Sequence, residues 1–344
     1  MATENRCWKL IARPKGDNFR DALKFTSQPM PQVRDGDVLI RNGYLSLDAG
    51  TRMWMSPRED SYQPPASSQD LPVAGMVLGT VVTSLHPDYR AGDLVRAYGQ
   101  WADFSVTRPD ETYIARLSWR QDDFRQYLAV FGPNGWTAHV GVHEVGRVRH
   151  GETFVVSSAA GVTGGLAGQM AKIAGCRVIG IVGSDAKCAY IKREFGFDGA
   201  INYRTQDVHG AVKSLCPDGV HVYFDNVAGP VLDAVLPNMA IRGRVAVCGL
   251  MTQYGVDEAV PGPYKYDQVL MKRLRIEGFF SPDFYHREPD FNRLTADAFR
   301  AGRLRMPFVV GDGLESTVDA YSQLFTGANI GKVIVQVAEL KRDN

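Results

Sequence analysis

The second half of the chain alternates short apolar runs with stretches of helical periodicity. The apolar runs predict strands at residues 153–157, 177–182, 199–202, 220–226, 244–248 and 274–280. Helical patterns fill the intervals, at residues 165–174, 186–195, 208–215 and 230–240. Parallel strands need crossover connections and are buried on both faces, so strands that alternate with helices predict a doubly wound parallel sheet. The second half is therefore expected to form an α/β domain.

The first half of the chain has a different pattern. Between Ala22 and about Val130 it runs in short β-rich pieces separated by Pro, Gly and Asp turns, which is typical of a small barrel or sandwich. Residues 53–70 lack periodicity and predict a long surface loop, of the kind that often carries function. After a helix predicted at about 290–301, a strand-like FVVGD, a helix near 318–325 and the segment GKVIVQVAE can return the chain to the first domain.

Composition and charge narrow the choice of partners. Among the 344 residues, 39 Lys and Arg balance 38 Asp and Glu, for a formal net charge of +1. Nothing in this balance favours nucleic acid or another polyanion. No apolar run approaches the roughly 18 residues that a membrane span needs. Charges in the opening segment MATENRCWKLIARPKG argue against a signal peptide, so a cytoplasmic protein is expected.

Metal and disulfide chemistry find no support in the sequence. The five cysteines form an odd number without a C-x-x-C pair, which argues against a disulfide framework. His139 and His143 are four residues apart and can share a helical face, but no carboxylate or thiol completes an obvious metal site. The motifs G-x-S-x-G and H-E-x-x-H do not occur, so hydrolase and metalloprotease templates are not expected either.

The most informative motif is a turn of small residues between a predicted strand and a predicted helix, FVVSSAAGVTGGLAGQMAK at residues 154–172. Such a turn lets the backbone approach a pyrophosphate, whose charge lies among free N–H groups at the helix N-terminus. Ala159 takes the place of the first Gly of the G-x-G-x-x-G fingerprint, so the motif depends on its strand-turn-helix context. A dinucleotide is the expected ligand. Its candidate contacts in this turn are Ala160, Gly161, Val162, Thr163 and Gly164.

The residues after the next predicted strand bear on which dinucleotide binds. A carboxylate there binds the ribose 2′-hydroxyl of NAD, whereas a cation accepts the 2′-phosphate of NADP. The strand ends in Gly183 and Ser184, and Lys187 is the candidate cation. Tyr203, at the end of the following strand, can contact the same phosphate. Asp185 is the counterargument because it could bind ribose instead, but the charges favour NADP(H).

Seven segments carry a wider resemblance: RNGYLSLD, SYQPP, AAGVTGGLAGQMAK, GIVGSDAKCAYIKREFGFDGAINYR, CPDGVHVYFDNVAG, AVCGLMTQY and GANIGKVIVQV. Over nearly its whole length the chain resembles the zinc-independent medium-chain dehydrogenases/reductases, in the group of leukotriene dehydrogenases, prostaglandin reductases and curcumin reductases (alkenal/one oxidoreductases). The resemblance implies a GroES-like domain at residues 1–132, a Rossmann NADP-binding domain at 133–302, and a return to the GroES-like domain at 303–344. It also implies NADPH, a homodimer, and reduction of a carbon–carbon double bond conjugated to a carbonyl group.

The resemblance also assigns residues to the cofactor. Ser184, Lys187 and Tyr203 match contacts to the 2′-phosphate. Asn226 and Asn329 match positions that hold the nicotinamide ribose and carboxamide, although Asn beside Gly is most often a turn residue. The further cofactor positions that the resemblance implies are Thr137, Gly161, Val162, Gly183, Gly249, Leu250, Tyr254 and Phe279.

One departure from the family concerns the substrate. The family usually has Asp-Pro-Tyr-Met-Arg where this chain has DAGTR at residues 48–52, so Gly50 replaces an aromatic hydroxyl. Tyr254 matches a family tyrosine near the nicotinamide and is the first candidate for orienting the substrate oxygen or relaying the proton; Tyr62 is the second. His139 also stands where relatives often have Tyr. The substrate-side candidates are Asp48, Arg52, Met53, Tyr62, Trp101, Tyr264 and Phe280.

The expected chemistry is transfer of a hydride from NADPH to the β-carbon of an α,β-unsaturated ketone or aldehyde, followed by protonation of the α-carbon. Hydrogen-bond donors must stabilise the enolate oxygen that forms on the way. Two alternatives stay open: a metal-free carbonyl or quinone oxidoreductase, and a catalytically decayed nucleotide-binding protein of the same fold. Gly50 in place of tyrosine is the main support for the second alternative.

Overall fold

The computed structural model describes residues 3–56, 70–119, 122–256, 258 and 260–340. The chain divides into two compact units. The first unit comprises residues 1–128, 308–329 and 333–344, and the second comprises residues 129–307 and 330–332. The boundaries after residues 128 and 307 lie a few residues from those expected after residues 132 and 302. The short segment 330–332 also belongs to the second unit.

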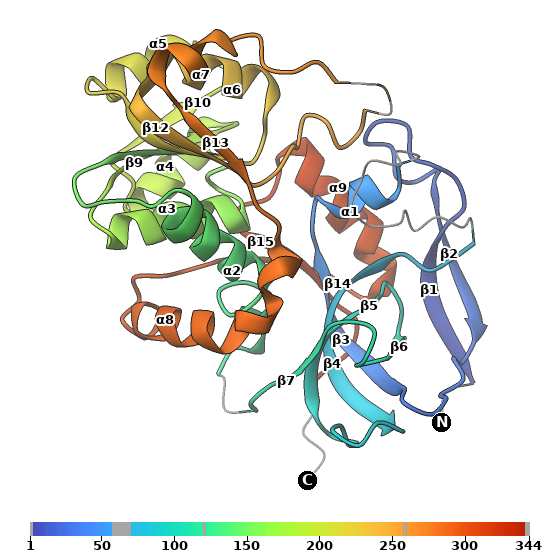
Figure 1. The fold of residues 1–344 in the computed structure, drawn as a ribbon. Coiled ribbons are helices and arrows are strands. Elements are labelled where there is room, and N and C mark those ends of the chain that lie inside the picture. The colour runs from blue at the N-terminus through green and yellow to red at the C-terminus, as the bar shows by residue number, and fades with distance from the viewer. Residues whose placement is uncertain (1–2, 57–69, 120–121, 257, 259, 341–344) are drawn as a thin grey trace. The chain divides into compact units, whose positions relative to one another are not determined.

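A sheet that joins both ends of the chain dominates the first unit. Its strands are β3 (Val38–Leu47), β4 (Ala74–Ser84), β5 (Leu94–Gln100), β6 (Phe104–Thr107), β7 (Ile114–Arg116), β14 (Phe308–Asp312) and β15 (Lys332–Gln336). Two further strands, β1 (Glu4–Leu10) and β2 (Leu23–Pro29), form a separate two-stranded sheet. The strand order is β14-β15-β3-β4-β5-β7, with β6 also on β3, while β1 and β2 pair with each other (Figure 1). Because β15 pairs antiparallel with β3, the C-terminal segment completes a sheet built mainly from the N-terminal one.

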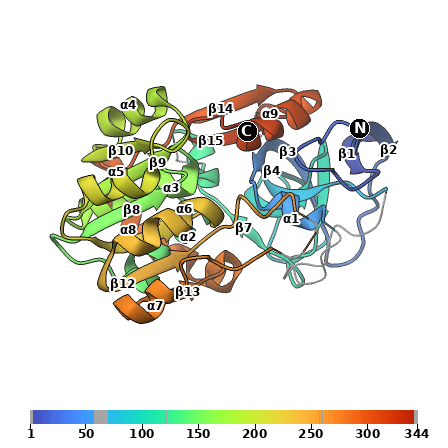
Figure 2. The ribbon, with the colours of Figure 1, turned by 90° about the horizontal axis from the view of Figure 1, so that it is seen from above.

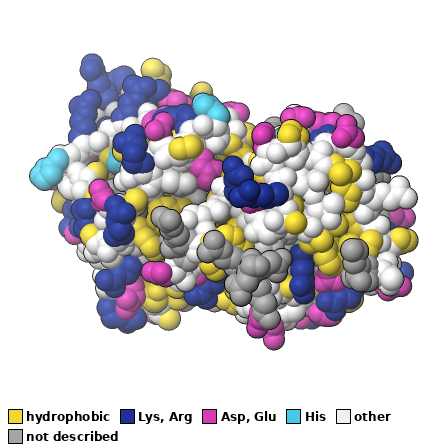
Figure 3. Space-filling view, turned by 90° about the horizontal axis from the view of Figure 1, so that it is seen from below, with side chains coloured by type: hydrophobic (Ala, Val, Ile, Leu, Met, Phe, Trp, Pro, Cys, Tyr) yellow, Lys and Arg dark blue, Asp and Glu magenta, His cyan; other side chains and the backbone are white. Residues whose placement is uncertain are grey.

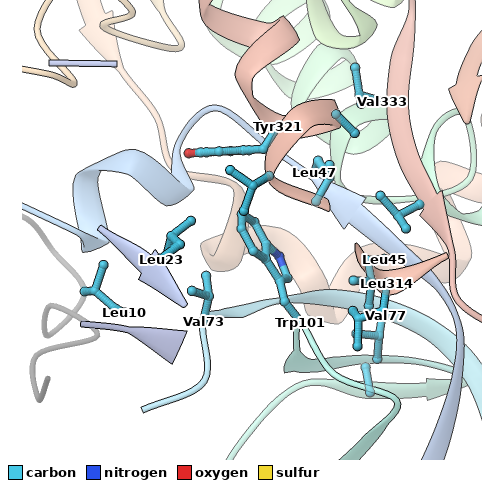
Figure 4. Close-up of a cluster of buried hydrophobic side chains, with 14 of the residues drawn as sticks. Leu10, Leu23, Leu45, Leu47, Val73, Val77, Trp101, Leu314, Tyr321 and Val333 are labelled. Atoms are coloured by element: carbon cyan, nitrogen blue, oxygen red, sulfur yellow. The ribbon is translucent and has the colours of Figure 1, made fainter. Parts of the chain in front are cut away.

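Short helices accompany this sheet, and a hydrophobic core lies against it. The helices are α1 (Thr51–Trp54) and α9 (Thr317–Thr326), with 3-10 turns at Phe124–Leu128 and Leu314–Ser316. Figure 4 shows Trp101 among aliphatic side chains of the sheet, with Tyr321 of α9 beside it. The two rings meet edge to face with their centroids 5.1 Å apart, and Trp101 is fully buried. Trp101, which was predicted to contact the substrate, uses its surface for packing in this core.

A six-stranded parallel sheet forms the second unit, as the sequence predicted. Its strands are β8 (Thr153–Ser157), β9 (Arg177–Val182), β10 (Gly199–Asn202), β11 (Val220–Asp225), β12 (Met239–Val247) and β13 (Arg275–Gly278). The strand order is β10-β9-β8-β11-β12-β13, and each neighbouring pair of strands runs parallel. The order reverses between β8 and β11, and in such sheets ligands bind at the carboxyl ends of the strands beside that reversal.

Helices cover both faces of this sheet (Figures 1 and 2). They are α2 (Pro133–His139), α3 (Val162–Ile173), α4 (Asp185–Glu194), α5 (Val208–Leu215), α6 (Gly229–Val235), α7 (Asp267–Lys272) and α8 (Glu288–Arg300), with 3-10 turns at Leu236–Asn238 and Ser281–Arg287. One predicted helix is shorter than expected. The helix expected at 230–240 ends at Val235, because Pro237 cannot donate the next helical hydrogen bond, and β12 then begins at Met239.

The surface mixes charges of both signs. Over most of the face in Figure 3, acidic and basic side chains lie among one another, with small groups of hydrophobic side chains between them. This mixture agrees with the net charge of +1. Among the described residues, no helix is both long enough and apolar enough to cross a membrane.

Candidate functional site

The turn that follows β8 keeps the conformation of a phosphate-binding turn without the first Gly of the fingerprint. Ser158, a small residue, takes the left-handed backbone conformation that the turn needs, with φ at 53°. Ala159 follows it and is fully buried. A Cβ added at Gly180, on the neighbouring strand β9, would lie 2.8 Å from the Cβ of Ala159. Because residue 180 is a glycine without a side chain, there is room for the methyl group of Ala159 where the fingerprint has its first glycine.

The helix after the turn packs closely against its surroundings because its glycines lack side chains. A Cβ at Gly164 would lie 2.5 Å from the carbonyl oxygen of Ser158, and one at Gly168 would lie 2.0 Å from the ring of Phe197. Gly161 precedes α3 in an extended conformation, and no side chain among the described residues caps the first helical turn. The N–H groups of that turn are therefore available to an anion, as binding of a pyrophosphate requires.

Two cations lie near each other at the ends of the next two strands. Lys187 is in the first turn of α4, and Arg204 follows β10. Burial lowers the pKa of the Lys187 ammonium, and the positive charge of Arg204 lowers it further. No carboxylate of the described residues is among the groups that shift the pKa of Lys187. A half-buried lysine beside a second cation is stabilised when an anion binds between them, so this corner suits a phosphate monoester.

The neighbours of this cation pair fit the same ligand. Ser184 caps α4, and its hydroxyl oxygen accepts the N–H of Lys187 at 3.2 Å. A Cβ at Gly183 would lie 3.1 Å from the ring of Tyr203, so the phenol packs directly on this glycine. Asp185, the residue that favoured NAD, accepts a hydrogen bond of 2.8 Å from the side chain of Asn202. The carboxylate that could have bound the ribose of NAD is therefore hydrogen-bonded to a neighbouring amide instead. Arg204 is the residue that sequence reasoning missed, although its place beside Tyr203 was a signal.

A second group of predicted residues gathers at the ends of β11 and β12. The side-chain amide of Asn226 donates to the carbonyl oxygen of Ser157 at 2.7 Å, which fixes its orientation. The hydroxyl of Tyr254 accepts the N–H of Leu250 at 3.1 Å. A Cβ at Gly249 would come within 3.0 Å of that hydroxyl. Burial raises the pKa of Tyr254 to about 12, so the phenol stays protonated and its own hydrogen remains free for a second partner.

Two further predicted cofactor positions belong to the same unit. Thr137 is in α2, and its hydroxyl donates to the carbonyl oxygen of Pro133 at 2.7 Å. Phe279, just after β13, packs against Gly141, where an added Cβ would lie 2.6 Å from the ring. The second unit therefore brings the turn after β8, the cation corner, Asn226, Tyr254 and Phe279 to the carboxyl ends of one parallel sheet.

Comparisons with known proteins agree with this geometry. Residues 6–114 match the family described as the N-terminal domain of oxidoreductase, and residues 162–297 match the family described as zinc-binding dehydrogenase. The chain is 35% identical over 339 residues to the NADPH-dependent curcumin reductase of Escherichia coli (strain K12), with 97% of each chain covered. It is 39% identical over 303 residues to the 2-alkenal reductase (NADP(+)-dependent) of Nicotiana tabacum, with 88% of each covered. The crystal structure of CurA from Vibrio vulnificus in complex with NADPH matches it with a TM-score of 0.90 at 32% identity, over 97% of this chain and 99% of that one.

The chain belongs to the medium-chain dehydrogenase/reductase family. The fold expected from the resemblance, a GroES-like β-rich domain with a Rossmann domain, is confirmed. One matched family is named for zinc, yet in the part of this dehydrogenase/reductase that the structure describes, no group of three or more His, Cys, Asp or Glu side chains is placed to hold a metal ion.

The expected substrate-side residues of this dehydrogenase/reductase fall mostly in the first unit. Arg52, a predicted substrate contact, is fully buried and donates to the carbonyl oxygens of Pro14 and Gly16. Asp48 accepts the hydroxyl of Ser46 at 2.6 Å. Met53 is half-buried, and Asn329, an expected cofactor contact, is a buried residue of the first unit. Tyr62 lies outside the described residues, while Tyr264 and Phe280 belong to the second unit.

A pair of histidines, of which His139 is half-buried and His143 is exposed, lies on an irregular helix two residues after Thr137. After α2 the backbone widens into a π-helix at Val140–Val145, a form that is rare and often found at functional sites. The rings of His139 and His143 are 4.7 Å apart. The adjacent Glu144 accepts two hydrogen bonds, of 2.8 and 2.9 Å, from Arg287. Burial first, and then the charge of a protonated His143, lower the pKa of His139 to about 4.

The histidine pair should make the folded dehydrogenase/reductase sensitive to acid. The unfolded chain binds a proton at residue 139 near pH 6.5, whereas the folded chain resists protonation until about pH 4. Stability is therefore full above pH 6.5 and is lost as the pH falls toward 4, by up to about 3 kcal/mol for this group. We expect the His139→Gln variant to lose less unfolding free energy between pH 7 and pH 4.5 than the wild type, as measured by urea denaturation. His150→Gln, at an exposed histidine, should follow the wild type; equal pH dependence of all three proteins would contradict this account.

Proposed function

We propose that this chain is an NADPH-dependent reductase of the carbon–carbon double bond in α,β-unsaturated ketones and aldehydes. The observation that carries the proposal is the combination of a phosphate-binding turn with the cation pair Lys187 and Arg204 at the ends of the next two strands. This combination occurs in a chain that is similar over 97% of its length to an NADPH-dependent curcumin reductase. A relative named 2-alkenal reductase supports the same class of substrate.

The residues at the sheet edge fit NADPH along its length. The uncapped first turn of α3, from Val162 onward, suits the pyrophosphate. The corner formed by Ser184, Lys187, Tyr203 and Arg204 suits the 2′-phosphate, which carries about −1.5 to −2 charges. We assign the nicotinamide half to the ends of β11, β12 and β13, with Thr137 and Asn329 as further contacts. That group of residues comprises Asn226, Gly249, Leu250, Tyr254 and Phe279.

Tyr254 is the side chain best suited to assist the reaction. When bound, NADPH supplies the hydride that adds to the β-carbon of the substrate. Negative charge then develops on the substrate oxygen, and a hydrogen-bond donor aimed at that oxygen lowers the barrier. The Tyr254 hydroxyl accepts the N–H of Leu250 and keeps its own hydrogen, so it can donate to the substrate oxygen. Water supplies the proton to the α-carbon where the family tyrosine is replaced by Gly50, and Tyr62 is the alternative donor.

The same proposal covers the substrate. At Gly50 an added Cβ would meet nothing within 4 Å among the described residues, and the family resemblance implies an aromatic residue at this position. We propose Asp48 and Met53 of the first unit as substrate contacts, and separately Tyr264 and Phe280 of the second; the apolar and aromatic side chains among them suit flat aromatic or long-chain enones. Trp101 and Arg52 are not included, because both are fully buried.

A panel of substrates tests the proposed function. Purified protein is mixed with NADPH, and separately with NADH, and the loss of cofactor absorbance is followed with an aryl enone, a long-chain enal and the matching saturated aldehyde. Oxidation of NADPH with the two unsaturated compounds alone is the expected result. Oxidation with the saturated aldehyde at a similar rate would instead identify a carbonyl reductase. Binding of NADPH without turnover of any compound would favour the decayed nucleotide-binding protein.

We also propose a homodimer that forms through β13. This strand is the edge of the parallel sheet, and its free backbone groups can pair with another strand. Arg275 and Glu277 flank Ile276 on it and form an ion pair with each other. An antiparallel pair of β13 strands about a two-fold axis at Ile276 would place Arg275 opposite Glu277 of the partner subunit. The large hydrophobic side chains exposed on β13, α7 and β12 are Ile241, Leu270, Met271 and Ile276.

Substitution of Ile276 by Lys should convert the dimer to a monomer. The change places two like charges across the two-fold axis and removes apolar contact at its centre. Light scattering coupled to size-exclusion chromatography gives the mass of each species. Val310→Lys is the matched control, because Val310 is 40% exposed on the edge strand β14 and Ile276 is 37% exposed on β13. A wild-type monomer, or the same mass for both variants, would contradict the proposed interface.

A further inference from the structure

A buried carboxylate with an uneven hydrogen-bond environment lies at the end of β11. Its Oδ1 atom, in Asp225, accepts the hydroxyl of Tyr223 at 2.9 Å and the hydroxyl of Ser157 at 3.2 Å. The same oxygen accepts the N–H groups of Val227 and Ala228, both at 2.9 Å. Ala228 has a left-handed φ of 62°, so the carboxylate also holds a strained turn in place. All four donors converge on one of the two oxygens.

The other oxygen of Asp225 has no hydrogen-bond partner among the described residues, although the side chain is fully buried. Protonation would have to occur on this Oδ2 atom, because Oδ1 already accepts four donors. The resulting O–H group would then be buried without an acceptor, which is unfavourable. Four donors to the carboxylate favour the ionised form. Burial raises the pKa of the Asp225 carboxyl, and the four donors act in the opposite direction. In its ionised form Asp225 carries a negative charge, and its Oδ2 atom has no hydrogen-bonded cation among the described residues.

The charge of Asp225 acts on the residues assigned to the nicotinamide half of the cofactor. Burial raises the pKa of both Cys248 and Tyr254, and the negative charge of Asp225 raises each of them further. The backbone N–H groups of Cys248 and Gly249 donate to the Asp225 carbonyl oxygen at 2.8 and 3.1 Å, and Asn226 is the next residue in the chain. The uncompensated charge is therefore located at the same part of the sheet edge as the proposed nicotinamide contacts.

We propose that Asp225 is a fixed anion by which the site distinguishes the two redox states of the bound dinucleotide. The oxidised nicotinamide ring carries a positive charge, whereas the reduced ring is neutral. A buried negative charge near the ring therefore stabilises bound NADP⁺ relative to bound NADPH. The phosphates are the same in both states, so contacts such as Lys187 do not contribute to this difference. The inference rests on the proposed binding of NADP(H) by the second unit.

Equilibrium binding of the two cofactor forms tests this role without any catalysed reaction. The dissociation constants for NADP⁺ and NADPH are measured by calorimetry for the wild type and for Asp225→Asn. The variant should weaken NADP⁺ binding about tenfold more than NADPH binding. Asp225→Glu, which restores the charge, should recover the wild-type ratio of the two constants. Tyr223→Phe, which removes one donor but keeps the charge, should change both constants by the same factor.

The ratio of the two constants separates this role from a purely structural one. If Asp225 only holds the turn, Asp225→Asn weakens both cofactor forms equally, and the proposal is overturned. If the Asn variant does not fold, Asp225→Ser, whose hydroxyl can keep one donor, provides the same comparison. A wild type that binds neither NADP⁺ nor NADPH would instead refute the proposed function itself.

Discussion

Replacing Lys187 with Ala should reduce the preference for NADPH over NADH by about 100-fold. The lysine is half-buried beside Arg204, and its pKa is lowered by burial and by that second cation. A bound 2′-phosphate relieves this repulsion and forms a charge-assisted hydrogen bond worth about 1.5–3 kcal/mol, close to the 2.7 kcal/mol of a 100-fold change. NADH lacks the phosphate, so its binding should change little. The measurement is kcat/KM for each cofactor with one enone.

The matched control for this prediction is Lys192→Ala. Lys192 is exposed on the same helix, α4, one and a half turns further along. Its removal should leave the cofactor preference within about twofold of the wild type, because an exposed lysine contributes little beyond local screening. An unchanged preference in Lys187→Ala, or an equal loss in both variants, would show that the cation corner does not bind the 2′-phosphate.

The second large effect is expected from the smallest possible change in α3, Gly164→Ala. Helix propensity alone predicts a gain of about 1 kcal/mol from this substitution. The added Cβ, however, would lie 2.5 Å from the carbonyl oxygen of Ser158 and 3.0 Å from that of Ser157, and backbone atoms cannot rotate away. We therefore expect a net loss of about 2 kcal/mol of unfolding free energy. The turn must also move, and a loss of about 2 kcal/mol in binding corresponds to a fall of about 30-fold in NADPH affinity.

Gly262→Ala provides the comparison for Gly164→Ala. An added Cβ at Gly262, in the same unit, would meet nothing within 4 Å among the residues that the structure describes. Urea denaturation and NADPH titration of the two variants separate the effect of contact from the effect of the substitution itself. Stabilisation of Gly164→Ala by the amount that helix propensity predicts would show that the turn is not as tightly packed as described.

The elements of the second unit could be predicted because each depends on local sequence. The apolar run at residues 153–157 and the pattern at 208–215 correspond to β8 and α5 with the same bounds. The phosphate-binding turn was recognised from its small residues and from the strand and helix around it. Its tolerance of Ala159 could not be predicted, because the compensating Gly180 lies on a neighbouring strand.

Contacts between distant parts of the sequence explain what was missed. Trp101 was expected at the substrate because an apolar ring suits either a pocket or a core, and only the return of Tyr321 beside it decides for the core. Ser157 and Asp225 are 68 residues apart and meet because β8 and β11 are neighbours in the sheet. Neither residue was a candidate at first, since nothing in the local sequence marks a buried carboxylate.

The central claim, reduction of a carbon–carbon double bond by hydride from NADPH, is tested most directly by following the hydride. The protein is incubated with NADPH carrying two deuterium atoms at C4 of its nicotinamide ring and with an aryl enone, and the product is analysed by NMR and mass spectrometry. We predict a saturated ketone with one deuterium at the β-carbon and a hydrogen from solvent at the α-carbon. An allylic alcohol with deuterium at the former carbonyl carbon would contradict the claim and identify a carbonyl reductase.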